Sequence, residues 1–473
     1  MTAIDMTTLE GASVRLSADE IAALAAEVRG PLIGADSPAY DEARTIWNAM
    51  IDKRPGLIAR CTTTADIVQC VRFARKHGLL TAVRGGGHGI AGTAMCEGGL
   101  VIDLSPMKAA RVDPERRRVT IEAGATLAEL DAATQPYGLA APVGINSTTG
   151  LAGLTLGGGF GWLSRKYGMT IDNLISAEVV TAAGEVVRAS ATEHPDLFWA
   201  IRGGGGNFGV VARFELELHP VGPEVLCGLI VYSLAEAEPV LRQYRGFAGS
   251  APDELSVWVV MRKAPLLPFL PAQAHGADML ALAIMYAGDP ARGEPMVEPL
   301  RRFGTPLGEH VGLQPFAAWQ RAFDPLLTPG ARNYWKTHNL ITLDDGFLGA
   351  AAEYAGKLPS AQCEIFLGAI GGATARPAPD ATAYAHRDAR FVMNAHGRWD
   401  DPSDDARCIA WARSFHAATA RYAGEGAYVN FMTADERDRL SAAYGPNYER
   451  LARVKRTYDP TNAFRENQNI RPA

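Results

Sequence analysis

Three glycine clusters in the first half of the chain constrain its fold more than any other feature. They read RGGGHG from Arg84 to Gly89, TTGLAGLTLGGGFGWL from Thr148 to Leu163, and RGGGGNFGVV from Arg202 to Val211. Glycine has no Cβ, so such segments adopt left-handed backbone angles and let the backbone approach another group closely. A tight turn explains any one cluster taken alone. Three clusters within one stretch of alternating helices and strands predict instead that a single long ligand touches all of them.

The size and charge of the chain restrict its partners. It has 473 residues, a net charge of −6, 47% hydrophobic residues and 21% charged residues. This length allows about two to three domains with a large core. The charge balance gives no sign of a nucleic-acid surface or a polybasic membrane anchor. We therefore expect small-molecule partners, no nucleic acid and no membrane, and a monomer or homodimer.

The cysteines and the N-terminus indicate a cellular location. Six scattered cysteines form no CxxC pair, which is the pattern of reduced thiols. The first residues lack the basic start and apolar run of a signal peptide, and no apolar run approaches the ~18 residues of a membrane span. The sequence thus predicts a cytoplasmic protein.

The first half of the chain alternates between helical and strand patterns. TTADIVQCVRFARKHG has apolar residues at helical spacing and ends at Gly78,. A capping box from Thr126 to Glu129 predicts the start of a second helix, and Pro195 predicts a third. LISAEVVTAAGEVVRAS reads as two strands joined by a turn. These patterns are typical of an α+β domain.

The second half has a different sequence pattern. Short apolar runs alternate with helices and proline-rich loops, and we expect them to be strands of an antiparallel sheet in a second domain. The runs are LCGLIVYSL, LSVWVVMRKA, DMLALAIMYAG, CEIFLGAIGGA and ARFVMNAHGRW. The fold class predicted for the whole chain is α+β with two domains.

Common catalytic motifs are missing or out of context. The sequence contains no GxxxxGK[ST], HExxH or GxSxG. A GxGxxG pattern occurs at Gly204, Gly206 and Gly209, but VVARFELEL follows it. Those residues read as a strand, where a dinucleotide-binding fold needs a helix. The ten histidines show no metal-ligand spacing, so we expect no metal.

The three clusters and the C-terminal residues together carry a family resemblance. VRGGGHGIAG resembles the flavinylation loop of the berberine-bridge-enzyme-like oxidases, which are FAD-linked flavoproteins of the vanillyl-alcohol-oxidase type with a PCMH-type FAD-binding domain. GLTLGGGFGWLSRKYGMTIDNL is similar to their central signature, and YVNF with RTYDPTNAFRENQNI is similar to their C-terminal segments. The resemblance implies an FAD-binding domain from residues 1–220, with its core at about 53–220. A substrate-binding domain would occupy 221–424, and residues 425–473 would return to the FAD domain.

The resemblance also implies how FAD is held. His88 would be bonded to the 8α-methyl carbon of the flavin, which is chemically reasonable because a neutral imidazole nitrogen is a good nucleophile. The alternative is a histidine that caps a turn. Besides His88, the residues expected at the cofactor are Arg84, Gly85, Gly86, Gly87, Gly89, Asn146, Thr148, Thr149, Gly150, Gly153, Gly157, Gly158, Gly159, Gly161, Asn207, Gly209, Val210, Tyr428, Asn430 and Asn467.

Two positions depart from or refine the family pattern. Many members hold the flavin by a second bond from a cysteine that precedes the central glycines, but this chain has Asn146 there. An amide cannot add to the flavin as a thiolate can, so we expect a single covalent link. Thr149 lies where oxidases of the family carry a small residue and their oxygen-poor dehydrogenases a larger one. O2 is therefore the expected electron acceptor, although the Thr149 hydroxyl could instead serve only a local hydrogen bond.

The proton acceptor must differ from that of several relatives. These place a tyrosine base where this chain has Phe431, and phenylalanine has no proton to exchange. The family's acid–base residues often occupy the strand that matches ARFVMNAHGRW. Its period of two puts Val392, Asn394 and His396 on one face, and His396 is the titratable residue of that face. We expect His396 to be the base, with a structural histidine at a sheet end as the alternative.

Other polar residues have expected roles around the same reaction. Glu364, in CEIFLG, is the alternative base, and Lys336, in NYWKTHN, is expected to orient an oxygen or anion of the substrate. YVNFM is expected to be a strand with Tyr428 and Asn430 on one face and Phe431 on the other. Both residues are expected to border the flavin, although a buried tyrosine with a satisfied hydroxyl is an alternative for Tyr428.

The resemblance implies an FAD-dependent oxidase with one covalent histidyl link. It would oxidise a C–H bond next to oxygen or nitrogen in a small organic molecule and pass the electrons to O2, forming H2O2. One alternative is a flavin dehydrogenase with a different acceptor. Another is a flavin-carrying protein that binds a metabolite without efficient turnover. Sugars, amines, alkaloids, and phenolic or polyketide products all stay open as substrates.

Overall fold

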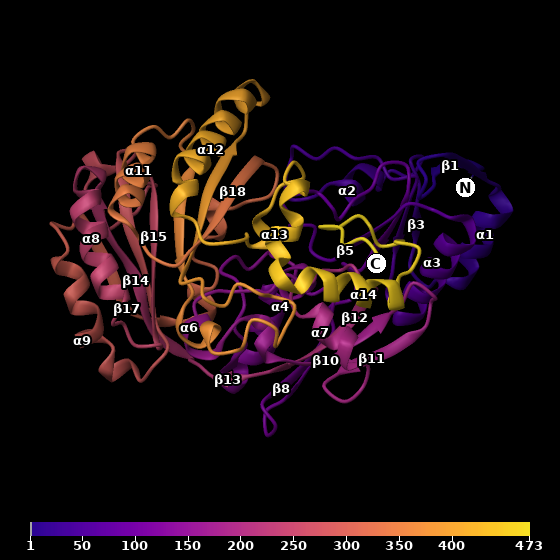
Figure 1. The fold of residues 1–473 in the computed structure, drawn as a ribbon, viewed down its shortest axis with the longest axis horizontal. Coiled ribbons are helices and arrows are strands. Elements are labelled where there is room, and N and C mark those ends of the chain that lie inside the picture. The colour runs from indigo at the N-terminus through magenta and orange to yellow at the C-terminus, as the bar shows by residue number, and fades with distance from the viewer. Residues whose placement is uncertain (1) are drawn as a thin grey trace.

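The computed structural model describes residues 2–473. Figure 1 shows the first half of the chain, coloured indigo to magenta, at one end and the salmon-to-orange strands of the second half at the other. The yellow C-terminal helices lie over the first half. The chain therefore leaves the N-terminal half, builds a large sheet and returns.

A four-stranded sheet near the N-terminus positions the first glycine cluster. Its order is β3-β4-β6-β5, and β4, β6 and β5 run parallel. The strands are β3 (Leu32–Ile33), β4 (Leu57–Arg60), β5 (Thr81–Arg84) and β6 (Leu100–Asp103). RGGGHG begins at the last residue of β5, the carboxyl end of a parallel strand, where open α/β sheets bind ligands.

Helix α3 (Thr64–His77) connects β4 to β5 and confirms the helical pattern predicted for this segment. Its apolar stripe, which includes Ile67 and Val71, is buried. Gly78 ends the helix with a φ of 62°, a left-handed angle that favours glycine. The crossover from β4 to β5 is thus fixed by local signals at both of its ends.

A five-stranded antiparallel sheet forms the rest of the first half. Its order is β11-β10-β12-β8-β7. The strands are β7 (Ala110–Asp113), β8 (Arg118–Glu122), β10 (Leu174–Val180), β11 (Val186–Ser190) and β12 (Val210–Glu217). The predicted turn between β10 and β11 is confirmed, and β12 follows the GxGxxG pattern as a strand. The expectation that this pattern is no dinucleotide-binding helix start is therefore confirmed.

The second half is organised around a seven-stranded sheet of order β17-β14-β16-β15-β19-β20-β18. Its neighbouring strands pair antiparallel. They are β14 (Glu224–Ser233), β15 (Leu255–Lys263), β16 (Asp278–Tyr286), β17 (Gly308–Pro315), β18 (Arg332–Leu340), β19 (Glu364–Ala369) and β20 (Phe391–Trp399). All five predicted apolar runs are strands of this sheet.

Helices cover one face of this sheet. Helices α11 (Asp345–Ala355) and α12 (Asp405–Thr419) pack on its strands, and α8 (Ala237–Ala248) packs on α11. The opposite face is turned toward the first half of the molecule, where its side chains line the cavity described below. Two strands, β17 and β18, were not among the predicted runs, since neither is continuously apolar.

The C-terminal segment is fixed to the third glycine cluster by a buried ion pair. Helices α13 (Leu440–Tyr444) and α14 (Tyr448–Tyr458) lead into it. Lys455 and Asp459 are fully buried and 2.7 Å apart, and Lys455 Nζ donates to the backbone oxygens of Asn207 and Phe464 at 2.6 and 3.2 Å. The tail and the loop before β12 are therefore held as one unit.

The remaining elements are short. The strands are β1 (Ile4–Thr7), β2 (Ser13–Leu16), β9 (Leu139–Ala140) and β13 (His219–Pro220), and the helices are α1 (Ala18–Glu27), α2 (Tyr40–Arg44), α4 (Leu127–Thr134), α5 (Leu151–Leu156), α6 (Ser164–Tyr167), α7 (Pro195–Ile201), α9 (Glu294–Val297) and α10 (Phe316–Trp319). Helix α4 begins with the predicted capping box and α7 begins at Pro195. Within residues 2–473, no helix has both the length and the apolar character needed to cross a membrane.

The prediction that YVNFM forms a strand is wrong. Val429–Phe431 is a turn of 3-10 helix. The segment packs on the second glycine cluster instead of pairing with a strand: the Tyr428 hydroxyl accepts a hydrogen bond from Gly159 N at 3.0 Å, and Asn430 Nδ2 donates to Leu154 O at 3.1 Å. Contacts with a segment far away in the sequence therefore override the local period of two.

Candidate active site

One cavity of about 330 Å³ lies between the glycine-rich first half and the seven-stranded sheet. All three glycine clusters, the C-terminal segment and the sheet contribute to its lining. Of the residues expected at the cofactor, those that line it are Gly85, Gly86, Gly87, His88, Gly89, Asn146, Thr149, Gly150, Gly153, Gly209, Val210, Tyr428, Asn430 and Asn467. Of the residues expected in catalysis, those that line it are Glu364, Asn394, His396 and Tyr428. The three glycine clusters, which are far apart in the sequence, therefore line one cavity.

Backbone forms the floor of the cavity. A Cβ atom on Gly86 would lie 2.5 Å from both Cα and N of Gly150, and one on Gly150 would lie 2.4 Å from Gly86 N. Real Cβ atoms do not approach so closely, so the first two glycine clusters touch backbone to backbone. This contact explains why glycine is needed at both positions: no side chain separates the loops from each other.

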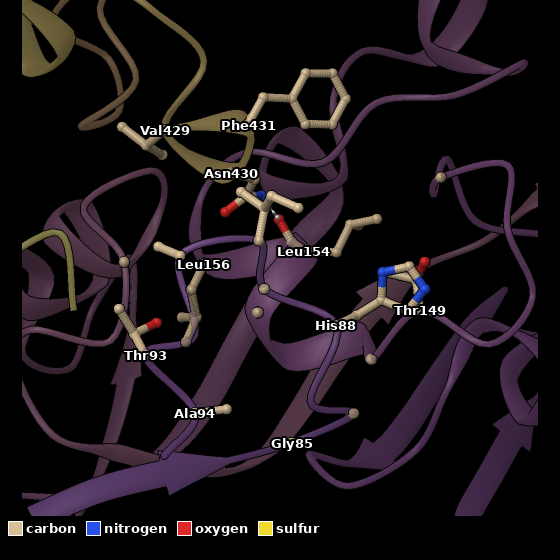
Figure 2. A pocket seen from close by; sticks show the side chains of 18 of the residues that line it. Gly85, His88, Thr93, Ala94, Thr149, Leu154, Leu156, Val429, Asn430 and Phe431 are labelled. Atoms are coloured by element: carbon tan, nitrogen blue, oxygen red, sulfur yellow. Dashed lines mark hydrogen bonds between the residues drawn. The ribbon is translucent and has the colours of Figure 1, made fainter. Parts of the chain in front are cut away.

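His88 stands on this floor in a neutral form. Its ring stacks on Trp47, with centroids 4.4 Å apart and an interplanar angle of 23°, and its Nε2 lies 3.3 Å from Thr148 Oγ1. Burial, and then the charge of Arg398, lower the pKa of His88 to about 3. The imidazole is therefore unprotonated at neutral pH and has a free lone pair. Figure 2 shows His88 and Thr149 among the residues around the cavity.

The C-terminal segment closes another side of the cavity. Besides its bond from Gly159 N, the Tyr428 hydroxyl accepts a hydrogen bond from Asn430 Nδ2 at 3.0 Å. Figure 2 shows the bond from Asn430 to Leu154. Burial raises the pKa of Tyr428 to about 12. Tyr428 is thus a buried tyrosine with an engaged hydroxyl, the alternative considered for it, and its ring lines the cavity.

Four side chains form a row across four strands of the sheet wall. The strand register pairs Arg262 with Glu364, Glu364 with His396, and His396 with Trp335, and directly opposed residues of an antiparallel sheet share a face. Arg262 Nη1 donates to Glu364 Oε2 at 2.7 Å, and His396 Nδ1 lies 3.0 Å from Glu364 Oε1. The Trp335 ring meets the His396 ring edge-on at 4.3 Å between centroids.

The charges in this row are set by their surroundings. Burial alone would raise the pKa of Glu364, but Arg262 and His396 outweigh it and bring the pKa to about 2. Burial lowers the pKa of His396, and its bond to Glu364 opposes this only in part. The row at neutral pH is therefore a guanidinium, a carboxylate and a neutral imidazole. With Nδ1 directed to the carboxylate, Nε2 carries the lone pair.

Some buried polar atoms at the cavity have no partner among residues 2–473. They are His396 Nε2, Asn394 Oδ1, Trp335 Nε1 and Asn146 Nδ2. Asn146 Oδ1 accepts from Thr148 N and Oγ1 at 3.0 and 2.6 Å, which leaves the amide nitrogen as the free end. Buried polar groups normally find a partner, so donors and acceptors left unpaired around a cavity indicate a site for a polar ligand.

The structure contradicts the expected role of Lys336. This residue neighbours Trp335 on β18, so it points to the opposite face of the sheet and does not line the cavity. Its Nζ contacts Thr433 Oγ1, Asp435 Oδ1 and Glu436 Oε2 at 3.3, 3.1 and 3.3 Å. Lys336 therefore anchors the chain at Thr433, Asp435 and Glu436 and does not reach the cavity.

Several residues expected at the cofactor lie behind the lining. They are Arg84, Thr148, Gly157, Gly158, Gly159, Gly161 and Asn207. Arg84 donates to Ala43 O, and Asn207 binds the backbone of Gly204 and Gln468 at 2.8 and 3.1 Å. A Cβ on Gly157 would overlap the Asn430 amide, at 2.1 Å from its oxygen. These residues shape the cavity by supporting the residues that line it.

Sequence reasoning missed several residues of the cavity wall. Trp47, Trp258, Trp335 and Phe366 line the cavity, and Arg262 pairs with Glu364 beside it. The period of two in LSVWVVMRK places Trp258 and Arg262 on one face of their strand. Nothing in that strand says which face meets the cavity, so the available signal was incomplete.

Comparisons with known proteins agree with this geometry. Residues 55–190 match the family model described as FAD binding domain, and residues 427–471 match the model described as Berberine and berberine like. The (R)-6-hydroxynicotine oxidase of Paenarthrobacter nicotinovorans is 31% identical over 463 residues, covering 94% of this chain and 97% of that protein. An uncharacterized FAD-linked oxidoreductase of Bacillus subtilis, YgaK, is 31% identical over 94% of this chain and 98% of its own length.

The chain belongs to the berberine-bridge-enzyme-like FAD-linked oxidoreductases. A crystal structure of 6-hydroxy-D-nicotine oxidase from Arthrobacter nicotinovorans matches it with a TM-score of 0.85 at 30% identity, over 94% of this chain and 98% of that one. The berberine-bridge-enzyme-like protein 1 of Physcomitrella patens shares the fold, with a TM-score of 0.86 at 23% identity over 96% of this chain and 99% of that one. The family resemblance drawn from the glycine clusters is confirmed.

FAD is the cofactor of this flavoprotein, and the residues present fit it. A flat ring system can lie against the floor, because glycines of the first two clusters line the cavity there without side chains. The free amide of Asn146 offers a donor to a ring oxygen or nitrogen. Gly206 and Asn467 extend the lining at the third cluster and the tail. Across residues 2–473 no cluster of three or more His, Cys, Asp or Glu side chains is arranged for a metal ion, and the six cysteines are free and buried.

Proposed function

We propose that this flavoprotein is an oxidase with a single covalent histidyl-FAD link. It oxidises a C–H bond next to oxygen or nitrogen in a small organic substrate, uses O2 as acceptor and releases H2O2. One observation carries the proposal: the same cavity joins the glycine floor that holds His88 to the sheet wall that holds Glu364 and His396. A substrate that lies between floor and wall meets the cofactor on one side and a base on the other.

His396 is the proposed base. Glu364 accepts a hydrogen bond from Nδ1–H of His396, which fixes the tautomer and leaves the Nε2 lone pair to take a proton from the substrate's hydroxyl or amine. Arg262 keeps Glu364 ionised, so the carboxylate also stabilises the imidazolium that results. FAD, when bound, would supply the hydride acceptor for the carbon that carries this hydroxyl or amine. Glu364 itself is a positioning residue, because each of its oxygens already has a partner.

Asn394 is proposed to orient the substrate. It lines the cavity on the same face of β20 as His396, two residues away. Its buried Oδ1 has no partner within the described residues. An acceptor beside a base is suited to a substrate group with two protons, one held by Asn394 and one removed by His396. Primary amines and hydrated or polyhydroxy carbons have such groups.

His88 is proposed to form the covalent link. Its low pKa keeps the ring nitrogen nucleophilic, and stacking on Trp47 holds the ring in one orientation. The link would replace one C–H bond of the 8α-methyl group; the protons of that C–H and of the imidazole N–H, with two electrons, would pass to O2 and form H2O2. Flavin should therefore stay with the acid-precipitated protein, and His88→Ala should release it. Free flavin from the parent protein would contradict the link.

The base is tested by anaerobic stopped-flow measurement of flavin reduction. His396→Ala should slow reduction by ~10² or more, and added imidazole should restore part of the rate by occupying the space left behind. His338→Ala is the matched control: this histidine is buried in the same sheet but on the opposite face, where it contacts His416 O at 2.9 Å. An unchanged rate and pH profile in His396→Ala would remove His396 from the mechanism and leave Glu364 as the base.

The electron acceptor is tested separately. Reduced enzyme mixed with air-saturated buffer should reoxidise rapidly and produce one H2O2 for each flavin. Slow reoxidation by O2, together with fast reoxidation by a quinone, would identify a dehydrogenase instead. A screen of sugars, amines, alkaloids and phenols for peroxide production would supply the substrate for both measurements.

A further inference from the structure

A second hollow of about 100 Å³ adjoins the main cavity. It lies on the same face of the seven-stranded sheet, over β14, β15 and β16, whereas the main cavity lies over β15, β19, β20 and β18. The two share lining residues, which form a waist between them: Ile145, Trp258, Leu327, Glu364 and Phe366. We call the second hollow the side chamber.

Small residues on one strand create the side chamber. Ala281 and Ala283 line it from β16, and the register places them opposite Val260 and Trp258 of β15. Trp162, Trp319 and Phe323 lie across from this sheet face, and Leu229 and Met279 complete an almost entirely apolar wall. The charged residues of its lining are Arg262 and Glu364, which neutralise each other. The chamber therefore suits an uncharged, apolar group.

Two tryptophans of the side chamber have no hydrogen-bond partner for Nε1 among residues 2–473. The chain has eight tryptophans, all within the described residues. Five donate from Nε1 to protein oxygens: Trp47, Trp199, Trp258, Trp399 and Trp411. The other three, Trp162, Trp319 and Trp335, are buried with Nε1 unpaired. All three line one of the two hollows, and Trp162 and Trp319 both line the side chamber.

This distribution points to a ligand. A buried indole N–H usually finds an acceptor, because a buried donor left without one destabilises the fold. The unpaired indole donors are confined to the hollows, while the other five tryptophans donate to protein oxygens. The rings of Trp162 and Trp319 are adjacent, with centroids 5.4 Å apart, so the two donors belong to neighbouring side chains of the chamber wall.

We propose that the side chamber is a binding subsite for an aromatic arm of the substrate, which carries a neutral oxygen acceptor at its far end. The arm passes the waist at Trp258 and Phe366, its ring fills the space above Ala281 and Ala283, and the oxygen accepts from Trp162 or Trp319. The proposal rests on the proposed function, because the oxidised carbon then lies in the main cavity beside His396. It narrows the substrate to amphipathic aromatic molecules and disfavours simple sugars, which have no apolar arm.

Binding of two small probes to the resting holoenzyme tests the chamber without turnover. Acetophenone has an aromatic ring and a ketone oxygen, and isopropylbenzene has nearly the same shape without the oxygen. Isothermal titration calorimetry should show that both bind and that Ala283→Leu, which fills the chamber, weakens both by tenfold or more. Ala352→Leu, a half-buried position on α11 at the opposite sheet face, should bind both as the parent does.

The titrations of the two probes decide whether the side chamber is the binding subsite. If Ala283→Leu bound both probes as tightly as the parent, the subsite would be elsewhere and the proposal would be overturned. Should that variant fail to fold, Ala322→Leu, an exposed residue at the chamber's edge, provides the same test. Because the enzyme is oxidised and no substrate is present, failure of the oxidase proposal would leave these titrations unaffected.

The hydrogen bond is tested by Trp162→Phe and Trp319→Phe, which keep an aromatic ring and remove the donor. At least one should weaken acetophenone by about fivefold, the equivalent of a net hydrogen bond of about 1 kcal/mol, and leave isopropylbenzene unchanged. Equal effects on the two probes in both variants would overturn the oxygen acceptor. Trp411→Phe, remote from both hollows and bonded to Tyr354 O, is the control.

Discussion

The floor and the wall of the active-site cavity are built on different physical principles. The floor consists of glycine loops whose backbones touch, as at Gly86 and Gly150. The wall consists of side chains that interact across strands, as in the row Arg262, Glu364 and His396. The floor thus depends on the absence of side chains, and the wall depends on particular pairs of them.

This difference has consequences for how each region tolerates change. A single methyl group on the floor collides with backbone, which cannot move aside as a flexible side chain can. A change in the wall leaves the sheet ladder intact but alters charge and proton transfer. The floor should therefore hold the cofactor, while substitutions in the wall should change the chemistry next to it.

Breaking the wall row should have the largest effect on stability. In Arg262→Met, Glu364 stays buried without its cation, and loss of one partner of a buried pair destabilises by about 3–5 kcal/mol. The double variant Arg262→Met/Glu364→Gln should recover much of this loss, because no uncompensated charge is then buried. Urea denaturation at pH 7 measures both.

The pH dependence of that loss follows from the pKa of Glu364. In the parent the folded pKa of about 2 lies below the ordinary 4.5, so its stabilisation is complete above pH 4.5 and disappears as the pH falls toward 2. In Arg262→Met the folded pKa should rise above 4.5, and protonation at low pH should then relieve the strain of burial. The deficit relative to the parent should shrink between pH 7 and pH 4. A deficit independent of pH would mean that Arg262 acts through packing.

Gly86→Ala tests the floor as Arg262→Met tests the wall. The new Cβ would lie 2.5 Å from Gly150, so the two loops must separate; we expect destabilisation of about 3 kcal/mol, the upper end for overpacking, and loss of most bound flavin. Flavin absorbance per polypeptide and the thermal midpoint provide the measurements. Gly246→Ala, in helix α8 with open space around its Cβ position, should leave both unchanged or slightly raise the midpoint. Full flavin content in Gly86→Ala would refute a floor made by close backbone contact.

Lys336→Met sharpens the distinction between the two faces of the sheet. Removing this cation should destabilise by about 1.5 kcal/mol, the lower end for a hydrogen bond to a charged group, because Arg413 and Arg439 still pair with Asp435 and Glu436. Flavin reduction and its pH profile should match those of the parent. A shifted profile would place Lys336 in the chemistry, contrary to its position on the far face.

The sequence predicted the floor better than the wall for a physical reason. Glycine clusters and helix caps are local signals, and Gly78 or the Thr126 capping box acts within its own turn. The turn at Tyr428 was mistaken for a strand because its hydroxyl is bound by Gly159 N, 269 residues away, and no local period records such a contact.

The wall needed information that no single strand contains. The period of two correctly grouped Asn394 with His396, and both line the cavity. The same period does not say which face of β18 is turned toward the cavity. The sequence therefore predicted a substrate contact for Lys336, whereas its neighbour Trp335 lines the cavity. Arg262 was missed because its importance lies in the register that sets it beside Glu364, a property of the sheet and not of the strand.

The smallest predicted effect concerns the access of O2 to the flavin past Thr149, a cavity-lining residue of the second glycine cluster. Thr149 lines the cavity at the end of a turn in which its N–H donates to Asn146 O at 3.1 Å and its carbonyl accepts from Leu127 N at 3.0 Å. These bonds fix the backbone, so Thr149→Leu changes bulk at one point without moving the loop. If O2 reaches the flavin past this side chain, reoxidation should slow about fivefold, equal to about 1 kcal/mol in activation free energy, while anaerobic reduction stays the same.

Thr149→Val, of nearly equal size, should reoxidise as the parent does. Equal reoxidation in the leucine variant, with a thermal midpoint lowered by overpacking of about 1–3 kcal/mol, would instead make Thr149 part of the rigid floor.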